Sequence, residues 1–366
     1  MKYLLLKSSL HEKSEAKKSA DELFALVEQK LGVHFAEGTA AEVGQEPACL
    51  VYMSTGGTAG LAKQALPELK GPVVLVTRGC QNSLSSSMET LTYITQQGKE
   101  AKLLHGTQEE VADDICTIVR AASARRSMQG MRLGLVGAPS DWLISTAVDY
   151  DRLKRDWGIE IVEISMDELI SEIEKKSYPE SAYTQELLKK PFDHDQVVQA
   201  LEIYGAFRRL VERYQLAGVS VRCFDLPTQI SMSILGTVSG QHAFQCNPSR
   251  VDRAANEIVF AHCTLPLDMP EKYHLDTHFE SKIGVAIAGD IPLGKVTIFK
   301  ASADLSHYFV ASGEIVEDLH EDDLCRTQIR VHCDVPVEQF LNSHVGNHYL
   351  VCRGDYADAV RACFGF

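Results

Sequence analysis

The chain has 366 residues, of which 45% are hydrophobic and 23% charged, so it is long enough for two or three domains with apolar cores. Its formal net charge is −14, which argues against a protein that follows nucleic-acid phosphates, since such a surface is basic. No apolar run approaches the length of a membrane span, and residues 1–6 are too few for a signal peptide, so we expect a cytoplasmic protein without nucleic-acid or membrane partners.

The ten cysteines are scattered along the chain without the paired spacing of a metal site. In a chain without a secretion signal, we expect them to be reduced and mostly buried as small hydrophobic side chains. This expectation also favours the cytoplasm.

The first 130 residues alternate short apolar runs with helical segments. We expect strands at 2–7, 48–53, 72–77 and 101–105, and helices at 12–31, 59–69, 83–97 and 108–128. Strands that alternate with helices of this length pair in parallel through right-handed crossovers. Residues 1–130 are therefore predicted to form a flavodoxin-like doubly wound domain.

Two loops of this domain follow strands, where a doubly wound sheet holds its ligands. One contains Thr55, Gly56, Gly57 and Thr58, and the other contains Asn82. Glycine lets a backbone approach a ligand, and the next helix offers free N–H groups, so both loops are candidates for binding phosphate or sugar hydroxyls. Their spacing matches neither a dinucleotide fingerprint nor a lysine-containing phosphate loop. Tight turns select the same glycines, so both interpretations stay open.

The alternation of strands and helices begins again after Gly130. We expect strands at 132–137, 159–164 and 219–224, and helices at 150–157, 166–175 and 195–216, with a polar link at 176–193. Residues 131–250 are therefore predicted to form a second flavodoxin-like domain. Its last strand ends at Asp225, again at the edge where ligands bind.

The C-terminal third has a different pattern. Short β-rich runs, punctuated by glycine and proline, lie at 257–261, 283–288, 295–300, 307–310, 325–333 and 349–352, and a last helix is expected at 355–363. Such spacing is typical of a mainly antiparallel barrel or sandwich. The predicted fold is therefore α/β: two flavodoxin-like doubly wound domains followed by a β-rich, barrel-like C-terminal domain at residues 251–366.

Polar side chains gather where the first of these β-rich runs ends. His262 and Thr264 follow it directly, and His278 comes soon after. Imidazole and hydroxyl groups at a strand end are expected at the mouth of a pocket. For any single histidine, an ordinary surface or capped position is the better interpretation. The clustering, together with a second cluster at Asn347 and His348, favours a functional site.

These motifs resemble those of L-fucose isomerase-like proteins. The similarity is carried by Ala261-His262-Cys263-Thr264, Thr277-His278-Phe279-Glu280-Ser281, Cys325-Arg326-Thr327-Gln328 and Gly346-Asn347-His348, with Thr55-Gly56-Gly57-Thr58, Asn82-Ser83-Leu84 and Cys223-Phe224-Asp225-Leu226 upstream. The motifs follow the family's order over nearly the whole chain. The resemblance implies two α/β domains and a β-rich domain, assembled as a homotrimer or homohexamer, and the conversion of an aldose to a ketose.

The resemblance also implies Mn2+, or another divalent cation, held by two carboxylates and a histidine. A proton would move between C1 and C2 of the sugar through a cis-enediol. His348 corresponds to the family's metal-binding histidine and Asn347 to its substrate-contacting neighbour. His262 is a further candidate metal ligand, and Thr264 and His278 are expected to contact the sugar. The loops at residues 55–58 and 82 would reach the site of an adjacent subunit.

The chain departs from the family after Leu226. Family members carry there a further segment that ends in Glu-Gly-Asp, whose glutamate binds the metal and shuttles the proton, whereas here Pro227 follows directly. The neighbourhood of the second carboxylate contains Asn247 instead. Asp225 and Glu280 are the candidates to replace these carboxylates. Three explanations stay open: an isomerase with other ligands, a non-catalytic sugar-binding or assembly protein on the same scaffold, or a sequence from which a loop has been omitted.

Overall fold

The computed structural model describes residues 1–139, 141, 143–145, 149–222, 243–262, 265, 272–278 and 283–364. They form two compact units: unit 1 comprises Met1–Ser127 and Asp358–Phe366, and unit 2 comprises Met128–Ala357. The predicted boundary at residue 130 lies close to the division between the units. The predicted boundary at residue 250 lies inside unit 2, within strand β9 (Ala243–Asp252).

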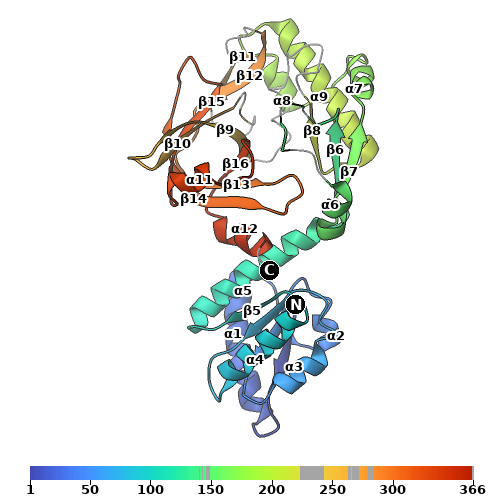
Figure 1. Ribbon diagram of the computed structural model, residues 1–366. Helices are drawn as coiled ribbons and strands as arrows, with labels where there is room; N and C mark the ends of the chain where they lie inside the picture. The colour runs from blue at the N-terminus through green and yellow to red at the C-terminus, as the bar shows by residue number, and fades with distance from the viewer. Residues whose placement is uncertain are drawn as a thin grey trace. The chain divides into compact units, whose positions relative to one another are not determined.

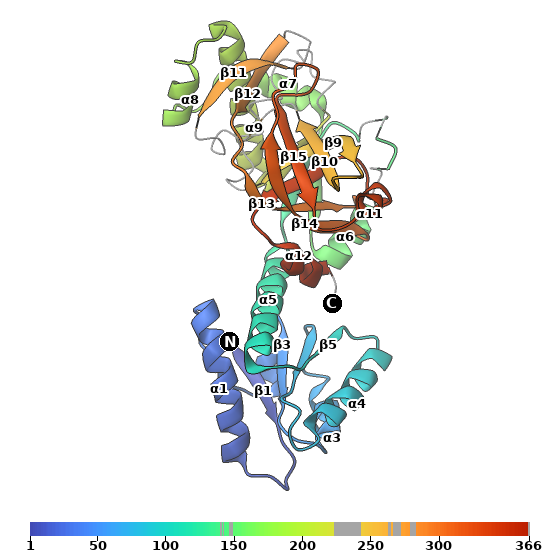
Figure 2. The same ribbon diagram turned by 90° about the vertical axis from the view of Figure 1, so that its left-hand side faces the viewer.

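Unit 1 is a parallel five-stranded sheet with helices on both faces (Figures 1 and 2). Its elements are β1 (Lys2–Leu6), α1 (Lys13–Leu31), β2 (Ala36–Glu37), α2 (Ala40–Val43), β3 (Cys49–Met53), α3 (Ala59–Ala65), β4 (Val73–Val76), α4 (Ser83–Gln96), β5 (Ala101–Leu104), α5 (Gln108–Ser127) and α12 (Ala357–Phe364), the last of which begins one residue before the unit boundary. The strand order is β2-β1-β3-β4-β5, with each neighbouring pair parallel.

The central strands of this sheet are apolar on both sides because helices cover both faces. All five residues of β3 are buried. Leu50 and Tyr52 pack with α1 and α5, whereas Val51 and Met53 pack with α3 and α4. A continuous apolar run is therefore the sequence signature of these strands, as expected for a parallel sheet.

The loops that follow β1, β3 and β4 meet at one edge of the sheet. The backbone N–H of Ser8 donates to Thr55 Oγ1 at 2.8 Å, and the N–H of Gly56 donates to the carbonyl of Gln81 at 2.7 Å. The strand order turns back between β1 and β3, which is where doubly wound sheets form a ligand crevice. The two predicted loops, at residues 55–58 and around residue 82, therefore lie at the same edge of the sheet.

Unit 2 begins with a second parallel sheet, in the order β7-β6-β8. Its elements are β6 (Arg132–Val136), α6 (Tyr150–Trp157), β7 (Glu160–Ile164), α7 (Met166–Ile173), α8 (Ala182–Leu187), α9 (His194–Tyr214) and β8 (Gly218–Val221). Helices α6, α7 and α9 follow Asp149, Ser165 and Asp193, whose side-chain oxygens accept backbone N–H groups of the first turn. These caps satisfy donors that a helix start leaves open.

The rest of unit 2 is a closed antiparallel barrel with an additional hairpin (Figure 1). The barrel strands run in the order β10-β15-β14-β13-β16-β9. Their bounds are β9 (Ala243–Asp252), β10 (Glu257–His262), β13 (Gly294–Ala301), β14 (Tyr308–Asp318), β15 (Thr327–Cys333) and β16 (Tyr349–Arg353); the hairpin is β11 (Tyr273–His278) with β12 (Ile283–Gly289), and the helix α11 is Val337–Leu341. The predicted β-rich region is thus confirmed as a barrel.

The barrel and the helices of unit 2 share one core. The buried cluster inside the barrel includes Phe260 and Val351, and it extends to Val197 and Leu201 of α9. The backbone N–H of Gly284 in β12 also donates to the side chain of Gln196 in α9 at 3.0 Å. This continuous core explains why residues on both sides of position 250 belong to one unit.

Several elements differ from the expectations. The link at 176–193 contains α8, which starts with reciprocal hydrogen bonds between Ser181 and Thr184, a capping box without the usual glutamate. Strand β9 was not predicted, because Asn247, Pro248 and Arg250 interrupt its apolar pattern. Helix α11, a single short helix after Pro336, also lies within the region expected to be β-rich. Strands β2 and β11 and helix α2 were not predicted either. The remaining described strands and helices follow the predicted order.

The cysteines of the described ranges are all free thiols, and several are buried. Burial raises the pKa of Cys333 to about 12 and that of Cys352 to about 11, so neither is a reactive thiolate near neutral pH. None of the described helices combines the length and the apolar character that crossing a bilayer requires.

Candidate functional site

Two histidines from distant parts of the chain meet at the barrel. His262 ends β10 and His348 directly precedes β16. Their rings lie edge to face with centroids 6.1 Å apart. Strand β9 brings them together, because its consecutive residues Cys246 and Asn247 pair with the strand residue beside each histidine. The two predicted histidine motifs therefore form one site.

Strand alternation places His262 on the inward face of the barrel. Ile258 and Phe260 are fully buried in the core, and His262 follows at the same two-residue spacing. Thr327 of β15 pairs directly with His262, and opposite residues point to the same face. Thr327 is itself fully buried. The inward row of apolar side chains therefore ends in a polar pair.

His348 is held in a defined state by its neighbour. Its Nδ1 lies 2.8 Å from Asn347 Oδ1, and because an amide oxygen can only accept, Nδ1 carries the proton and Nε2 keeps a lone pair. Burial lowers the pKa of His348, and the nearby charge of Lys300 lowers it further. The ring is therefore neutral at pH 7 and able to donate its Nε2 lone pair to a cation or a proton.

Lys300 adds a cation beside the histidines. It follows Val296 and Ile298 on the inward face of β13, and burial lowers its pKa. Gly346 adopts a φ of +102°, and a Cβ there would lie 3.5 Å from Lys300 Cε. A side chain at position 346 would therefore strain the turn that carries His348 to Lys300.

Two buried oxygen atoms near the histidines have no hydrogen-bond partner among the residues that the structure describes. They are Asn247 Oδ1 and Thr327 Oγ1. Buried polar groups are nearly always satisfied, and each exception calls for a water, an ion or a ligand. Asn247 lies next to the residue that pairs with Tyr349, and Thr327 pairs with His262. Thr327 Oγ1 therefore lies on the same face as His262, whereas Asn247 shares the face of its partner Ala261 and is next in register to His348.

These groups provide part of a ligand set for a divalent cation. Imidazole nitrogen and amide oxygen both bind first-row divalent ions, and carbonyl-type oxygen suits manganese. The predicted carboxylates, Asp225 and Glu280, lie outside the described residues. Within the described ranges, three groups with metal-binding atoms inside 4.8 Å of one another occur at Asp290, Asp318 and His320, on other strand ends. Exposed acidic groups often cluster without an ion, and we assign none to this trio.

The other predicted contacts of the barrel site are only partly visible. Thr264 lies outside the described residues. For His278, only the backbone is described, as the last residue of β11. Arg326 links this strand to the site, because its Nε lies 2.8 Å from Asp276 and it directly precedes Thr327. The end of β11 is thus fastened next to the strand that carries Thr327.

In the predicted loop at residues 55–58, the hydroxyl groups of both threonines form hydrogen bonds within unit 1. Thr55 and Thr58 are almost fully buried. Thr58 Oγ1 donates to the carbonyl of Thr55 at 2.9 Å and lies 3.1 Å from Ser86 Oγ. A Cβ at Gly56 would come within 3.0 Å of Asn82 Cβ, and Gly57 has a φ of +73°. The turn by itself therefore accounts for these residues, although Gly57 and Asn82 remain exposed.

Thr58→Val tests whether this loop is structural. The change keeps the shape of the side chain but removes its buried hydroxyl, so we expect the free energy of unfolding to fall by about 1–2 kcal/mol. The matched control is Thr92→Val, whose exposed hydroxyl donates to the carbonyl of Met88 and should change stability by less than about 0.5 kcal/mol. Urea unfolding measures both values. Weaker sugar affinity in a stable Thr58→Val protein would instead indicate a binding role.

Lys300, Asn247 and Thr327 were not among the predicted site residues. A sequence signal exists for Lys300, because a lysine continues the inward alternation of Val296 and Ile298. Thr327 is part of a motif that carries the family resemblance, but hydroxyl side chains are common at strand ends. Asn247 lies in the strand that was not predicted, so nothing along the chain connected it with the histidines.

No protein-family model matches this chain, and a search of curated proteins found no match either.

Proposed function

We propose that the protein is a metal-dependent aldose–ketose isomerase of the L-fucose isomerase-like kind. The strand order of unit 1 is that of flavodoxin-like sheets, and the second parallel sheet and the closed barrel follow in the order that the resemblance implies. The motifs of this resemblance run from Thr55 to His348 in the family's order. These features support the scaffold, and the barrel site supports the chemistry.

The observation that carries the proposal is the state of His348. Its Nδ1–H is held by Asn347, its ring faces His262, and its lowered pKa keeps Nε2 unprotonated. A histidine oriented in this way by a hydrogen bond on its other nitrogen is the usual arrangement of a metal ligand. The buried, unpartnered oxygen of Asn247 beside it supports the same interpretation.

The residues of the site have distinct expected roles. His348 and His262 would hold the cation, together with Asp225 or Glu280. When bound, a divalent cation stabilises the negative charge that develops on neighbouring sugar oxygens. The Lys300 amine can donate a hydrogen bond to such an oxygen, and the Thr327 hydroxyl can bind a sugar hydroxyl. A carboxylate would carry the proton between C1 and C2.

A screen of aldoses with and without Mn2+ tests the proposal. We expect at least one pentose or 6-deoxyhexose to be converted to its ketose with Mn2+, and the conversion to stop after chelation with EDTA and return when the metal is restored. In deuterated water the product should gain deuterium at the carbon that receives the proton. Full conversion in the presence of EDTA would contradict the metal-dependent mechanism.

A second candidate is a sugar-binding protein without catalysis. It is favoured by the direct connection of Leu226 to Pro227 and by Asn247 in place of a carboxylate, since both changes remove acidic groups that the reaction uses. Calorimetry separates the two candidates. Saturable binding of an aldose that shows no turnover with Mn2+, Mg2+ or Co2+ would favour the binding protein, and measured turnover would exclude it.

A further inference from the structure

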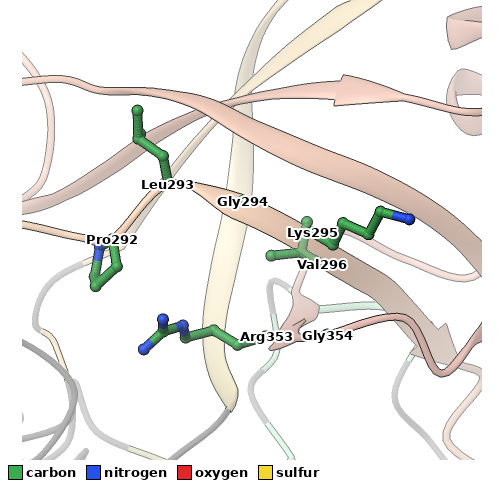
Figure 3. Close-up of a pocket in the computed structure, with 7 residues that line it drawn as sticks. All are labelled: Pro292, Leu293, Gly294, Lys295, Val296, Arg353 and Gly354. Atoms are coloured by element: carbon green, nitrogen blue, oxygen red, sulfur yellow. The ribbon is translucent and has the colours of Figure 1, made fainter.

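A pocket lies on the barrel, apart from the histidines. It has a volume of about 330 Å3, at the small end of ligand pockets, and is lined by Pro292, Leu293, Gly294, Lys295 and Arg353, among others (Figure 3). The turn between β12 and β13 forms one wall and the end of β16 forms the other. The N–H of Gly354 donates to the Lys295 carbonyl at 2.8 Å and joins the two walls.

This pocket is distinct from the candidate active site. Lys295 and Lys300 are five positions apart on β13, which corresponds to about 17 Å along a strand. Val296 pairs with Arg353, whereas Phe299 pairs with Leu350, so the pocket and His348 lie at opposite ends of the β13–β16 pair. A molecule in this pocket would therefore not occupy the position of the sugar.

Arg353 is unlike the other arginines of the chain. All arginines fall within the described ranges, and every other one forms an ion pair or a hydrogen bond with another residue there. The partly buried Arg353 has no such partner among the described residues, and its guanidinium points toward Pro292 (Figure 3). The nearest carboxylate along the chain, Asp355, accepts a hydrogen bond from Ser312 instead.

The missing partner is informative because the protein is acidic. With a net charge of −14, carboxylates are abundant, yet none of the described residues that line this pocket carries one. A guanidinium that is partly withdrawn from water is stabilised by an anion, and its planar donors suit the paired oxygens of a carboxylate or phosphate. Since no described residue supplies that anion, the pocket suits a bound molecule that carries negative charge.

We propose that this pocket binds the phosphate group of a small molecule, with Arg353 as its main ligand. A Cβ built on Gly294 would meet no atom within 4 Å, so there is open space beside the backbone. Leu293 is 60% exposed at the rim and offers an apolar contact to the organic part of the molecule. Lys295 points away from Arg353 and contributes a second positive charge at longer range (Figure 3).

Titration of the full-length protein with inorganic phosphate tests this proposal, with binding followed by calorimetry at low ionic strength. We expect saturable binding to the wild type and a dissociation constant about tenfold higher for Arg353→Gln, because a charge-assisted, paired hydrogen bond is lost. Arg353→Lys keeps the positive charge but loses the paired donors, so its dissociation constant should lie between those of the wild type and of Arg353→Gln. Lys295→Gln should have the smaller effect. Arg253→Gln, at an exposed arginine paired with Glu338, is the matched control.

Thermal unfolding shows whether each variant is folded. If Arg353→Gln is unstable, the phosphate affinity of Arg353→Lys is compared with that of the wild type instead. Acetate and methyl phosphate in place of inorganic phosphate separate a general carboxylate site from a phosphate site. Absence of saturable phosphate binding to the wild type, or equal affinity in Arg353→Gln and the wild type, would overturn the proposal. A preference for acetate over phosphate would also overturn it.

Discussion

If the proposed isomerase activity holds, replacing His348 with alanine is expected to lower the Mn2+-dependent turnover on the order of a thousandfold, or about 4 kcal/mol of transition-state stabilisation. The reason is geometric. His348 is the histidine whose Nδ1–H is held by Asn347 and whose Nε2 is available, so its loss removes an oriented ligand from the site. The fold should persist, because His348 precedes β16 and is not part of the buried core, to which its neighbour Tyr349 belongs.

The matched control for this prediction is His307→Ala, at an exposed histidine of the same barrel. In His348→Ala, we expect lower turnover of each aldose with Mn2+ and weaker Mn2+ binding, measured by electron paramagnetic resonance. Both should stay unchanged in the control. If His348→Ala turns over sugar as fast as the wild type, His348 has no part in the mechanism.

The pH dependence gives an independent check on His348. Its pKa lies below the ordinary value of 6.5, so the folded protein takes up this proton at lower pH than the unfolded chain does. Mn2+ affinity should therefore persist as the pH falls through 6.5 and decline only below it. Since the unfolded chain binds the proton first, the histidine's contribution to the free energy of unfolding decreases as the pH drops below 6.5. His348→Ala should lack both effects.

The largest expected effect on stability comes from Glu172→Gln. Glu172 is only 3% exposed, and it is surrounded by Lys175, Arg209 and Arg213. Its Oε2 lies 2.7 Å from Arg209 Nε, and its backbone carbonyl accepts a second bond from the same guanidinium. Neutralising it leaves three cations without their shared anion. We expect a loss on the order of 3 kcal/mol in the free energy of unfolding, toward the low end for a broken buried pair because Lys175 and Arg213 are partly solvated.

Acid titration distinguishes this charge effect from a packing effect. The hydrogen bond from Lys175 is the largest cause that lowers the pKa of Glu172 to about 2, and those from the two arginines add to it, whereas the same group in the unfolded chain has a pKa of 4.5. Its stabilisation is therefore complete above about pH 4.5 and is lost progressively as the pH falls toward 2. Between pH 4.5 and 2, the free energy of unfolding of the Glu172→Gln protein should therefore fall less than that of the wild type.

The control for Glu172 is Glu174→Gln, an exposed residue two positions further along the chain. Urea unfolding of both variants and the wild type at pH 7 and at pH 4 provides the comparison. A Glu172→Gln protein within about 0.5 kcal/mol of the wild type at pH 7 would show that the buried network adds little to stability.

Most of unit 1 could be predicted from local patterns. The run at 48–53 contains only apolar residues, and the structure places β3 there with every residue buried. Fully apolar runs of this length, separated by amphipathic helices, predict a parallel sheet that is covered on both faces. The glycine-rich loop after β3 was also recognisable, although its residues alone could not distinguish a turn from a binding loop.

The barrel was less accessible to sequence reasoning. Strand β9 combines buried Phe244 and Cys246 with polar residues and Pro248, and only half of it pairs with each neighbour. Its identity as a strand depends on pairing with β10, which follows it closely, and with β16, which is close in space but far along the chain. Because β9 is the strand that joins the two histidines, missing it also left Asn247 out of the predicted site.

The sequence by itself determined the succession of parallel and antiparallel regions and the two histidine motifs, because periodicity and strand-end chemistry are local properties. Only the tertiary structure decided that His262 and His348 share one site, that Lys300 lies beside them and that Arg353 lacks a partner among the described residues. Each of these facts concerns which groups surround a side chain. Barrel closure sets those surroundings by pairing strands from distant parts of the chain, and spacing along the chain does not encode that pairing.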